Sequence, residues 1–243
     1  MAAGGGQAGQ TSAVKVWNVD TASEVSAVHG HANQAFGVAF GPENLLATAG
    51  ADGTVRFWDV NTGREAGKSL GDSHGISIFS MALAPQSRRL ATCDAYHSVK
   101  FWDLTTGQHK TLKGHLGFVC SPAFSPDNEW VASGDSAGKV LVWNAASGKV
   151  RYKFVGDRSY VWGLAFSPDG RYLAISNWKE VKIWDLKNHQ EMPRTLGGLA
   201  GTINGLAFSP DGRYLAAAGG YKGKGEIKIW HRTLWDKPAD KGN

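Results

Sequence analysis

Short runs that alternate between apolar and polar residues recur along the whole chain. Five of them end in tryptophan: TVRFW, SVKFW, KVLVW, EVKIW and EIKIW. A period of two is typical of a strand with one buried face. Two apolar stretches joined by a turn precede each run, most clearly in GLAFSPDGRYLA, which occurs at 163–174 and again at 205–216. The Pro-Asp-Gly turn is a hairpin signal, so the pattern predicts three antiparallel strands per unit and a weaker fourth after the tryptophan.

The tryptophan that closes each unit marks an internal repeat. It is followed by Asp, Asn or His at six positions: Trp17, Trp58, Trp102, Trp143, Trp184 and Trp230. Successive intervals are 41 to 46 residues. A fixed period in this range indicates stacked copies of one supersecondary unit. Four strands in a unit of this length leave little room for a helix.

These copies resemble the WD-repeat β-propellers, in which each blade is a four-stranded antiparallel sheet. The resemblance covers nearly the whole chain and implies an all-β propeller of about six blades in a single domain, 1–243, with a frayed basic tail at 236–243. It also implies a structural set of a loop His, a second-strand Ser or Thr, a turn Asp and the third-strand Trp. One unit matches this set fully, with His31, Thr48, Asp52 and Trp58.

In other units the set is incomplete, since Tyr96 and Ala137 align with the turn Asp and the last two units lack the loop His. The first unit is also short, because it begins at the second strand, which leaves about 23 strands where six blades need 24. An open blade presents an unpaired edge. Three interpretations follow: a six-bladed ring with a defective blade, a piece of a longer and often seven-bladed propeller, or two chains that complete each other.

Composition supports a globular protein without evident catalytic chemistry. The chain is 42% apolar and 19% charged, and no apolar run approaches membrane-spanning length. It contains no P-loop, HExxH, GxSxG or paired CxxC motif, so we expect no enzyme activity and no cofactor. His29 and His31 are close in sequence but lack further ligands at metal-binding spacing, so no metal site is expected. Two cysteines, Cys93 and Cys120, favour a reducing compartment, with the cytoplasm as default.

Aromatic residues cluster where each first strand begins. In the propeller family this region lies at the channel rim, where partner peptides dock. Tyr and Trp are typical interface anchors, because they bury much area at low rotamer cost. We expect Phe36 and its counterpart Phe79 to pack in the core rather than to act as interface anchors. We expect Tyr160 and Trp162 to be exposed. The complete partner-binding hypothesis names Phe36, Phe118, Tyr160 and Trp162, with Tyr96 and Trp178 in support.

Charge gives a weaker signal. The net charge is +5, which raises the question of nucleic-acid binding. A basic residue recurs two positions before the tryptophan in five units, at Lys15, Arg56, Lys100, Lys182 and Lys228. That regularity spreads charge over the repeats, whereas a nucleic-acid footprint is a one-sided stripe. Only Lys222 and Lys224, in the longest expected turn between second and third strands, form a local basic loop.

The sequence therefore predicts a non-catalytic module that binds a protein or peptide partner on one face of a rigid propeller. The alternatives are a docking or sensor fragment of a larger bacterial signalling protein, and a nucleic-acid binder acting through basic loops. Nucleic acid is the less favoured partner, and no membrane partner is expected. Self-association to complete the open blade stays a further option.

Overall fold

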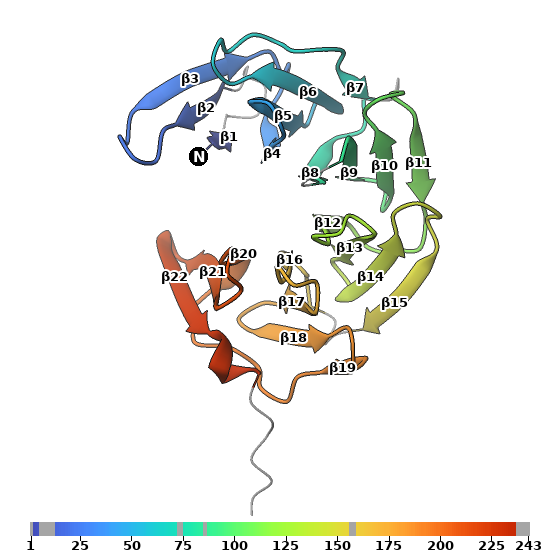
Figure 1. Ribbon diagram of the computed structural model, residues 1–243, viewed down its shortest axis with the longest axis vertical. Helices are drawn as coiled ribbons and strands as arrows, with labels where there is room; N and C mark the ends of the chain where they lie inside the picture. Colours follow the sequence, from blue (N-terminus) through green and yellow to red (C-terminus); the bar gives the residue numbers. More distant parts are fainter. Residues whose placement is uncertain (1, 5–12, 72–74, 85–86, 156–158, 237–243) are drawn as a thin grey trace, which may run out of the picture. The chain divides into compact units, whose positions relative to one another are not determined.

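The computed structural model describes residues 2–4, 13–71, 75–84, 87–155 and 159–236 (Figure 1). The chain divides into two compact units, Met1–Pro122 and Ala123–Asn243. Within the described residues the regular structure is β, apart from the 3-10 helix η1 (Arg232–Leu234). The predicted all-β class of small antiparallel sheets is thus confirmed. In the described part of the chain, no helix has the length and apolar character that a membrane crossing requires.

The first unit contains three sheets whose strands follow the chain order. The first sheet consists of β1 (Ala2–Gly4), β2 (Ala13–Trp17) and β3 (Glu24–His29). The second consists of β4 (Ala35–Phe40), β5 (Leu45–Gly50), β6 (Thr54–Asp59) and β7 (Leu70–Gly71). The third consists of β8 (Ile78–Leu83), β9 (Arg89–Asp94), β10 (Val99–Asp103) and β11 (His109–Leu112).

The second unit also follows the chain order. The fourth sheet consists of β12 (Val119–Phe124), in which the boundary between the units falls, β13 (Trp130–Asp135), β14 (Lys139–Asn144) and β15 (Val150–Val155). The fifth consists of β16 (Leu164–Phe166), β17 (Tyr172–Ser176), β18 (Val181–Asp185) and β19 (Gln190–Glu191). The sixth consists of β20 (Thr202–Phe208), β21 (Tyr214–Tyr221) and β22 (Lys224–His231).

The first and last sheets differ from the four-stranded pattern. In the first, the signature Trp17 lies on β2, and β1 takes the place of a second strand, as the sequence predicts for a unit without its innermost strand. Among the residues that the structure describes, the sixth sheet has three strands, where the sequence predicts four. After β22 the chain turns into η1, which returns Trp235 to the interior at 1% exposure. Within the described residues, the buried indole of Trp235 thus follows β22 at the point where other units have a fourth strand.

The structure describes the expected tail, 236–243, at its first residue, Asp236. Asp236 accepts hydrogen bonds from the Tyr172 hydroxyl and from Arg232 Nε, the latter at 2.8 Å. These bonds fix the end of η1 against β17. The rest of the predicted tail, 237–243, lies outside the described residues.

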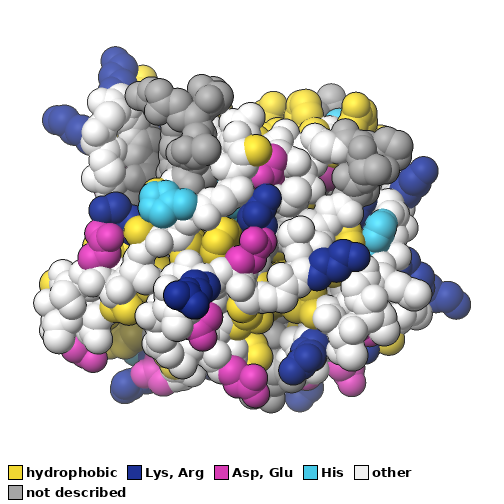
Figure 2. Space-filling view, turned by 90° about the horizontal axis from the view of Figure 1, so that it is seen from above, with side chains coloured by type: hydrophobic (Ala, Val, Ile, Leu, Met, Phe, Trp, Pro, Cys, Tyr) yellow, Lys and Arg dark blue, Asp and Glu magenta, His cyan; other side chains and the backbone are white. Residues whose placement is uncertain are grey.

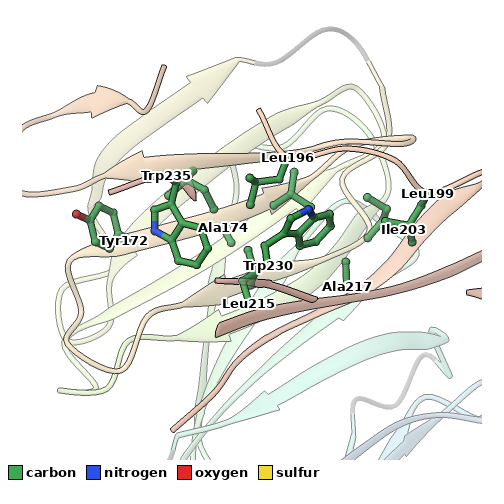
Figure 3. Packing of buried hydrophobic residues seen from close by; sticks show 11 residues of the cluster. Tyr172, Ala174, Leu196, Leu199, Ile203, Leu215, Ala217, Trp230 and Trp235 are labelled. Carbon is green, nitrogen blue, oxygen red and sulfur yellow. The ribbon is translucent and has the colours of Figure 1, made fainter. Parts of the chain in front are cut away.

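Each unit has its own core, formed where neighbouring sheets pack face to face. In the second unit Trp230 and Trp235 lie among aliphatic side chains of β17, β18, β20 and β21 (Figure 3). In the first unit Trp58 packs against Val14 and Val28 of the first sheet, and Trp102 joins the cluster between the second and third sheets. Each aliphatic side chain of Leu or Ile size that is buried in these cores contributes about 1.5–3 kcal/mol to the stability of the fold. Four of the six repeated tryptophans, Trp58, Trp102, Trp143 and Trp230, are thus buried core residues, while Trp17 and Trp184 are partly exposed.

Candidate aromatic binding site

Phe36 and Phe79 lie on β-bulges at the start of their strands. The register of β4 shifts between Ala35 and Gly37, and that of β8 shifts between Ile78 and Ser80. A bulge leaves one residue unpaired and re-aims its side chain. Phe36 and Phe79 are therefore 42% and 39% exposed, with ring centroids 5.4 Å apart. The prediction that they are core residues is wrong, because strict alternation does not hold across the bulge.

Tyr160 and Trp162 form a stacked pair in the second unit, just before β16. Their ring centroids are 5.2 Å apart and their planes differ by 8°. They are 41% and 36% exposed, while Val161 between them is buried and its N–H donates to the carbonyl of Asp135. Alternation thus points both rings outward. The expected exposure of this pair is what the structure has.

Trp178 lies at the same end of the fifth sheet as this pair. It is 54% exposed on the turn between β17 and β18, and its carbonyl accepts the N–H of Ile203 at 3.2 Å. The N–H of Ser176 donates to the carbonyl of Gly163, which holds that turn beside the entry to β16. We call the exposed side chains of Tyr160, Trp162 and Trp178 the aromatic platform.

Tyr96 and Phe118 are exposed on the first unit, at 71% and 48%. The ring centroids of Phe118 and His97 are 5.3 Å apart, so His97, which the sequence pattern does not single out, also takes part in this group. His97 follows Tyr96 in the turn before β10 and has a φ of 63°, in the left-handed region. The repeat pattern predicts a turn at this position, whereas the contact with Phe118 joins residues that are distant in the sequence.

The four residues of the expected structural set are joined by hydrogen bonds in the second sheet. His31 Nε2 lies 2.7 Å from Thr48 Oγ1, which also accepts the indole N–H of Trp58 at 2.8 Å. His31 Nδ1 lies 3.0 Å from both carboxylate oxygens of Asp52. Burial raises the pKa of Asp52, but hydrogen bonds from Thr54 and His31 outweigh this and lower it below its ordinary value. The set ties the loop before β4 to the interior of the sheet.

In the third and fourth sheets an aspartate two residues after the Ser or Thr organises the turn. Asp94 Oδ1 accepts the N–H groups of Tyr96 and Ser98, and Asp135 Oδ1 accepts those of Ala137 and Lys139. Both aspartates are at most 3% exposed. In these two units the turn Asp thus lies two residues earlier than Tyr96 and Ala137, the positions expected from the repeat. The signal was present as an Asp closing the second strand of each of these two units.

The recurring cations are mostly paired within their own sheets. Nζ of Lys15 lies 2.7 Å from Glu24, Arg56 Nη1 lies 3.2 Å from Glu65, and Nζ of Lys182 lies 3.5 Å from Glu191. Each of these glutamates is paired with the signature Trp of its own sheet. Lys100 lies 3.6 Å from Asp94. On the face drawn in Figure 2, basic and acidic side chains are interspersed.

The expected basic loop is the tip of a long hairpin. Strands β21 and β22 are paired as far as Tyr221 and Lys224, so the turn consists of Lys222 and Gly223 alone, with φ values of 50° and 79°. Two residues with positive φ are typical of a tight hairpin turn. The prediction of a long loop is wrong, because the two strands extend further than the repeat pattern indicates. Lys222 Nζ lies 5.3 Å from the Tyr221 ring centroid.

Titratable groups of the described residues form no evident reaction centre. No group of three or more His, Cys, Asp or Glu in the described part of the chain could hold a metal ion. Cys93 and Cys120 are both free thiols, and burial raises the pKa of Cys93 well above its ordinary value. The cytoplasmic location expected from these cysteines stays a prediction.

Comparison with known proteins gives one family and several partial relatives. The family model described as the first beta-propeller of IFT122 matches residues 7–235. The chain is 41% identical over 78 residues to the small ribosomal subunit protein RACK1z of Arabidopsis thaliana, covering 32% of this chain and 24% of that protein. It is 28% identical over 181 residues to the nuclear distribution protein PAC1 of Arthroderma otae, covering 74% and 35%.

A third relative is the nuclear distribution protein nudF of Aspergillus niger, at 25% identity over 209 residues, 75% of this chain and 46% of that protein. The matched region thus spans between about a quarter and a half of the length of these relatives.

Proposed function

Because the chain belongs to the family of the IFT122 first beta-propeller and carries WD-repeat signatures, we propose that it is a non-catalytic module that binds a protein or peptide partner. The observation that carries the proposal is the aromatic platform. Tyr160 and Trp162 stack on each other and keep more than a third of their surface in water. Exposed apolar surface of this kind is typical of interaction sites.

The platform is suited to binding because its backbone is fixed before a partner arrives. Val161 is buried and its N–H is bonded to Asp135, while Gly163 accepts the N–H of Ser176. Rings on a rigid backbone lose little conformational entropy on binding, so more of the burial energy remains as affinity. Aromatic residues supply most hot spots of protein interfaces. We assign Tyr160 and Trp162 the main contacts and Trp178 a supporting one.

In the first unit, Phe36, Phe118 and Tyr96 offer further aromatic surface, each more than 40% exposed. We propose that they contact the same class of partner. The name of one relative, a protein of the small ribosomal subunit, makes that relative part of a larger assembly. This supports a role in assembly for the present chain.

The alternative of a nucleic-acid partner has less support. Four of the five recurring cations lie within 4 Å of a carboxylate, so the field of each is largely compensated nearby. Docking as part of a larger signalling protein is compatible with the proposed function. Self-association through the open edges is a separate proposal that a measured molar mass would test.

The test is retention of partners from a cell extract by immobilised protein. We compare the wild-type chain with the Tyr160→Ala/Trp162→Ala double variant and, as a control, a Tyr214→Ala variant, which removes another exposed aromatic of the second unit. The proposal expects a protein that is retained by the wild type and the control but not by the double variant. That protein is then purified and titrated directly against the wild-type chain and the double variant. Equal retention by all three would contradict the assignment to the platform.

A further inference from the structure

A second surface, separate from the exposed aromatic residues, lies between the second and third sheets of the first unit. It is a cavity of about 450 Å³, within the size range of small ligand sites. We call it the leucine-lined groove. Its floor is formed by one Phe and four Leu side chains: Leu45, Phe57, Leu70, Leu83 and Leu104.

The groove is open because the outer strand of the second sheet is short. The chain makes one bridge, between Trp58 and Glu65, and then passes through Ala66 and Gly67 before β7 pairs two residues. Gly67 has a φ of 89°, and a Cβ placed on it would meet no atom within 4 Å. At Ala66 and Gly67 this segment therefore leaves the space between the second and third sheets unfilled. An apolar side chain from another molecule fits the space that this strand leaves.

The rim of the groove is polar and carries more positive than negative charge. Lys68 and Arg88 are exposed and form no ion pair with a carboxylate of the described residues, while Glu43 is the acidic side chain among those that line the site. Ser87 Oγ is buried without a hydrogen-bond partner among the residues that the structure describes. Because solvent does not reach that oxygen, recognition of charge at the rim rests on Lys68 and Arg88.

We propose that the leucine-lined groove binds a peptide segment of a partner protein, in which a bulky apolar side chain is flanked by a carboxylate. The apolar side chain covers Leu45, Leu83 and Leu104. The carboxylate lies near Lys68 and Arg88 on the rim. The excess of positive charge on the rim selects an acidic peptide over a basic one.

The test begins with a library of random 12-residue peptides displayed on phage and selected against the wild-type chain. Enriched peptides are synthesised with a fluorescent label and titrated against variants of matched melting temperature. Ala66→Tyr fills the groove with a ring, since Ala66 lines the groove and its N–H is fixed by the Phe57 carbonyl. Its control is Ala146→Tyr, on an exposed turn of the second unit.

Charge is tested by Lys68→Glu with Lys149→Glu as control, since both lysines are exposed. The lysine change stays informative even where the bulkier ring prevents folding. The proposal expects enriched peptides that combine an acidic and a large apolar residue. It expects their affinity to fall at least tenfold in Ala66→Tyr and several-fold in Lys68→Glu, while both controls and the Tyr160→Ala/Trp162→Ala variant bind as the wild type does.

Enrichment of basic peptides, affinity that is unchanged in both groove variants, or the absence of any enriched peptide would overturn the proposal. Peptides that lose affinity only in the Tyr160→Ala/Trp162→Ala variant would also overturn it and would instead support the aromatic platform.

Discussion

The space between the second and third sheets and the space between the fourth and fifth sheets are built from the same repeat but filled differently. In the second unit β15 supplies Phe154, whose ring centroid lies 4.2 Å from that of Trp184, and Tyr152, whose hydroxyl donates to the Leu186 carbonyl. In the first unit the corresponding segment supplies Ala66 and Gly67, and a cavity remains. The outer strand, which carries the weakest sequence signal, thus decides whether two sheets leave a groove between them.

The largest effect is expected from emptying the filled space. Phe154→Ala should lower the free energy of unfolding by about 3–5 kcal/mol, because a buried ring is lost and a cavity is left. Leu70→Ala, at the matching position of the second sheet, should lower it by about 1–2 kcal/mol, since Leu70 already borders an open groove. Urea unfolding of both variants checks the contrast. Equal losses would mean that the two spaces are packed alike.

The next effect concerns the hydrogen-bonded set that supports the second sheet beside its open groove. Thr48→Val should lower the free energy of unfolding by about 2–3 kcal/mol, because His31 Nε2 and Trp58 Nε1 both lose a buried partner. Thr111→Val, on an exposed position of β11, is the control and should change it little. If the two substitutions had the same effect, the set would not be what holds this sheet.

A smaller contrast is expected between the aspartates that follow the signature tryptophans of the third and fifth sheets. Asp185 is 1% exposed and accepts two hydrogen bonds from Arg171, at 2.8 and 3.1 Å. Burial raises its pKa, but the bonds from Arg171 and Asn188 prevail and lower it. The N–H groups of Thr105 and Thr106 lower the pKa of Asp103, which is exposed.

For both aspartates the folded-state pKa lies below the unfolded value of about 3.9. Their stabilisation is therefore complete above about pH 4 and is lost as the pH falls through the lowered folded-state pKa. Asp185→Asn should lower the free energy of unfolding at pH 7 by about 1–3 kcal/mol and by less at acidic pH. Asp103→Asn should have the smaller effect. A pH-independent loss in Asp185→Asn would contradict the assignment.

The smallest effect is expected from filling the groove. Ala66→Tyr should raise the free energy of unfolding by about 0.5–1 kcal/mol, as cavity-filling substitutions commonly do. Ala146→Tyr should leave it unchanged. A loss of stability in Ala66→Tyr would mean that the groove does not admit a ring. The groove would then differ in shape from the space that Tyr152 fills between the fourth and fifth sheets.

The repeated strands, the incomplete first sheet and the residues of the second-sheet hydrogen-bonded set follow from the sequence, because alternation and a fixed period are local signals. The bulges that expose Phe36 and Phe79 do not, since a one-residue slip leaves the apolar pattern almost unchanged. The groove beside Ala66 depends on a short outer strand without periodic signal. The burial of Trp235 after β22, in the part of the chain that the structure describes, depends on packing between sheets and has no periodic signal.

The most direct test of the account compares partner retention by three forms of the chain in one experiment: wild type, Tyr160→Ala/Trp162→Ala, and Ala66→Tyr. The account predicts that the double variant loses one set of bound proteins and the groove variant loses another, with melting temperatures close to that of the wild type. If both variants retained every protein that the wild type binds, neither the aromatic platform nor the groove would be a binding surface, and the proposed function would be wrong.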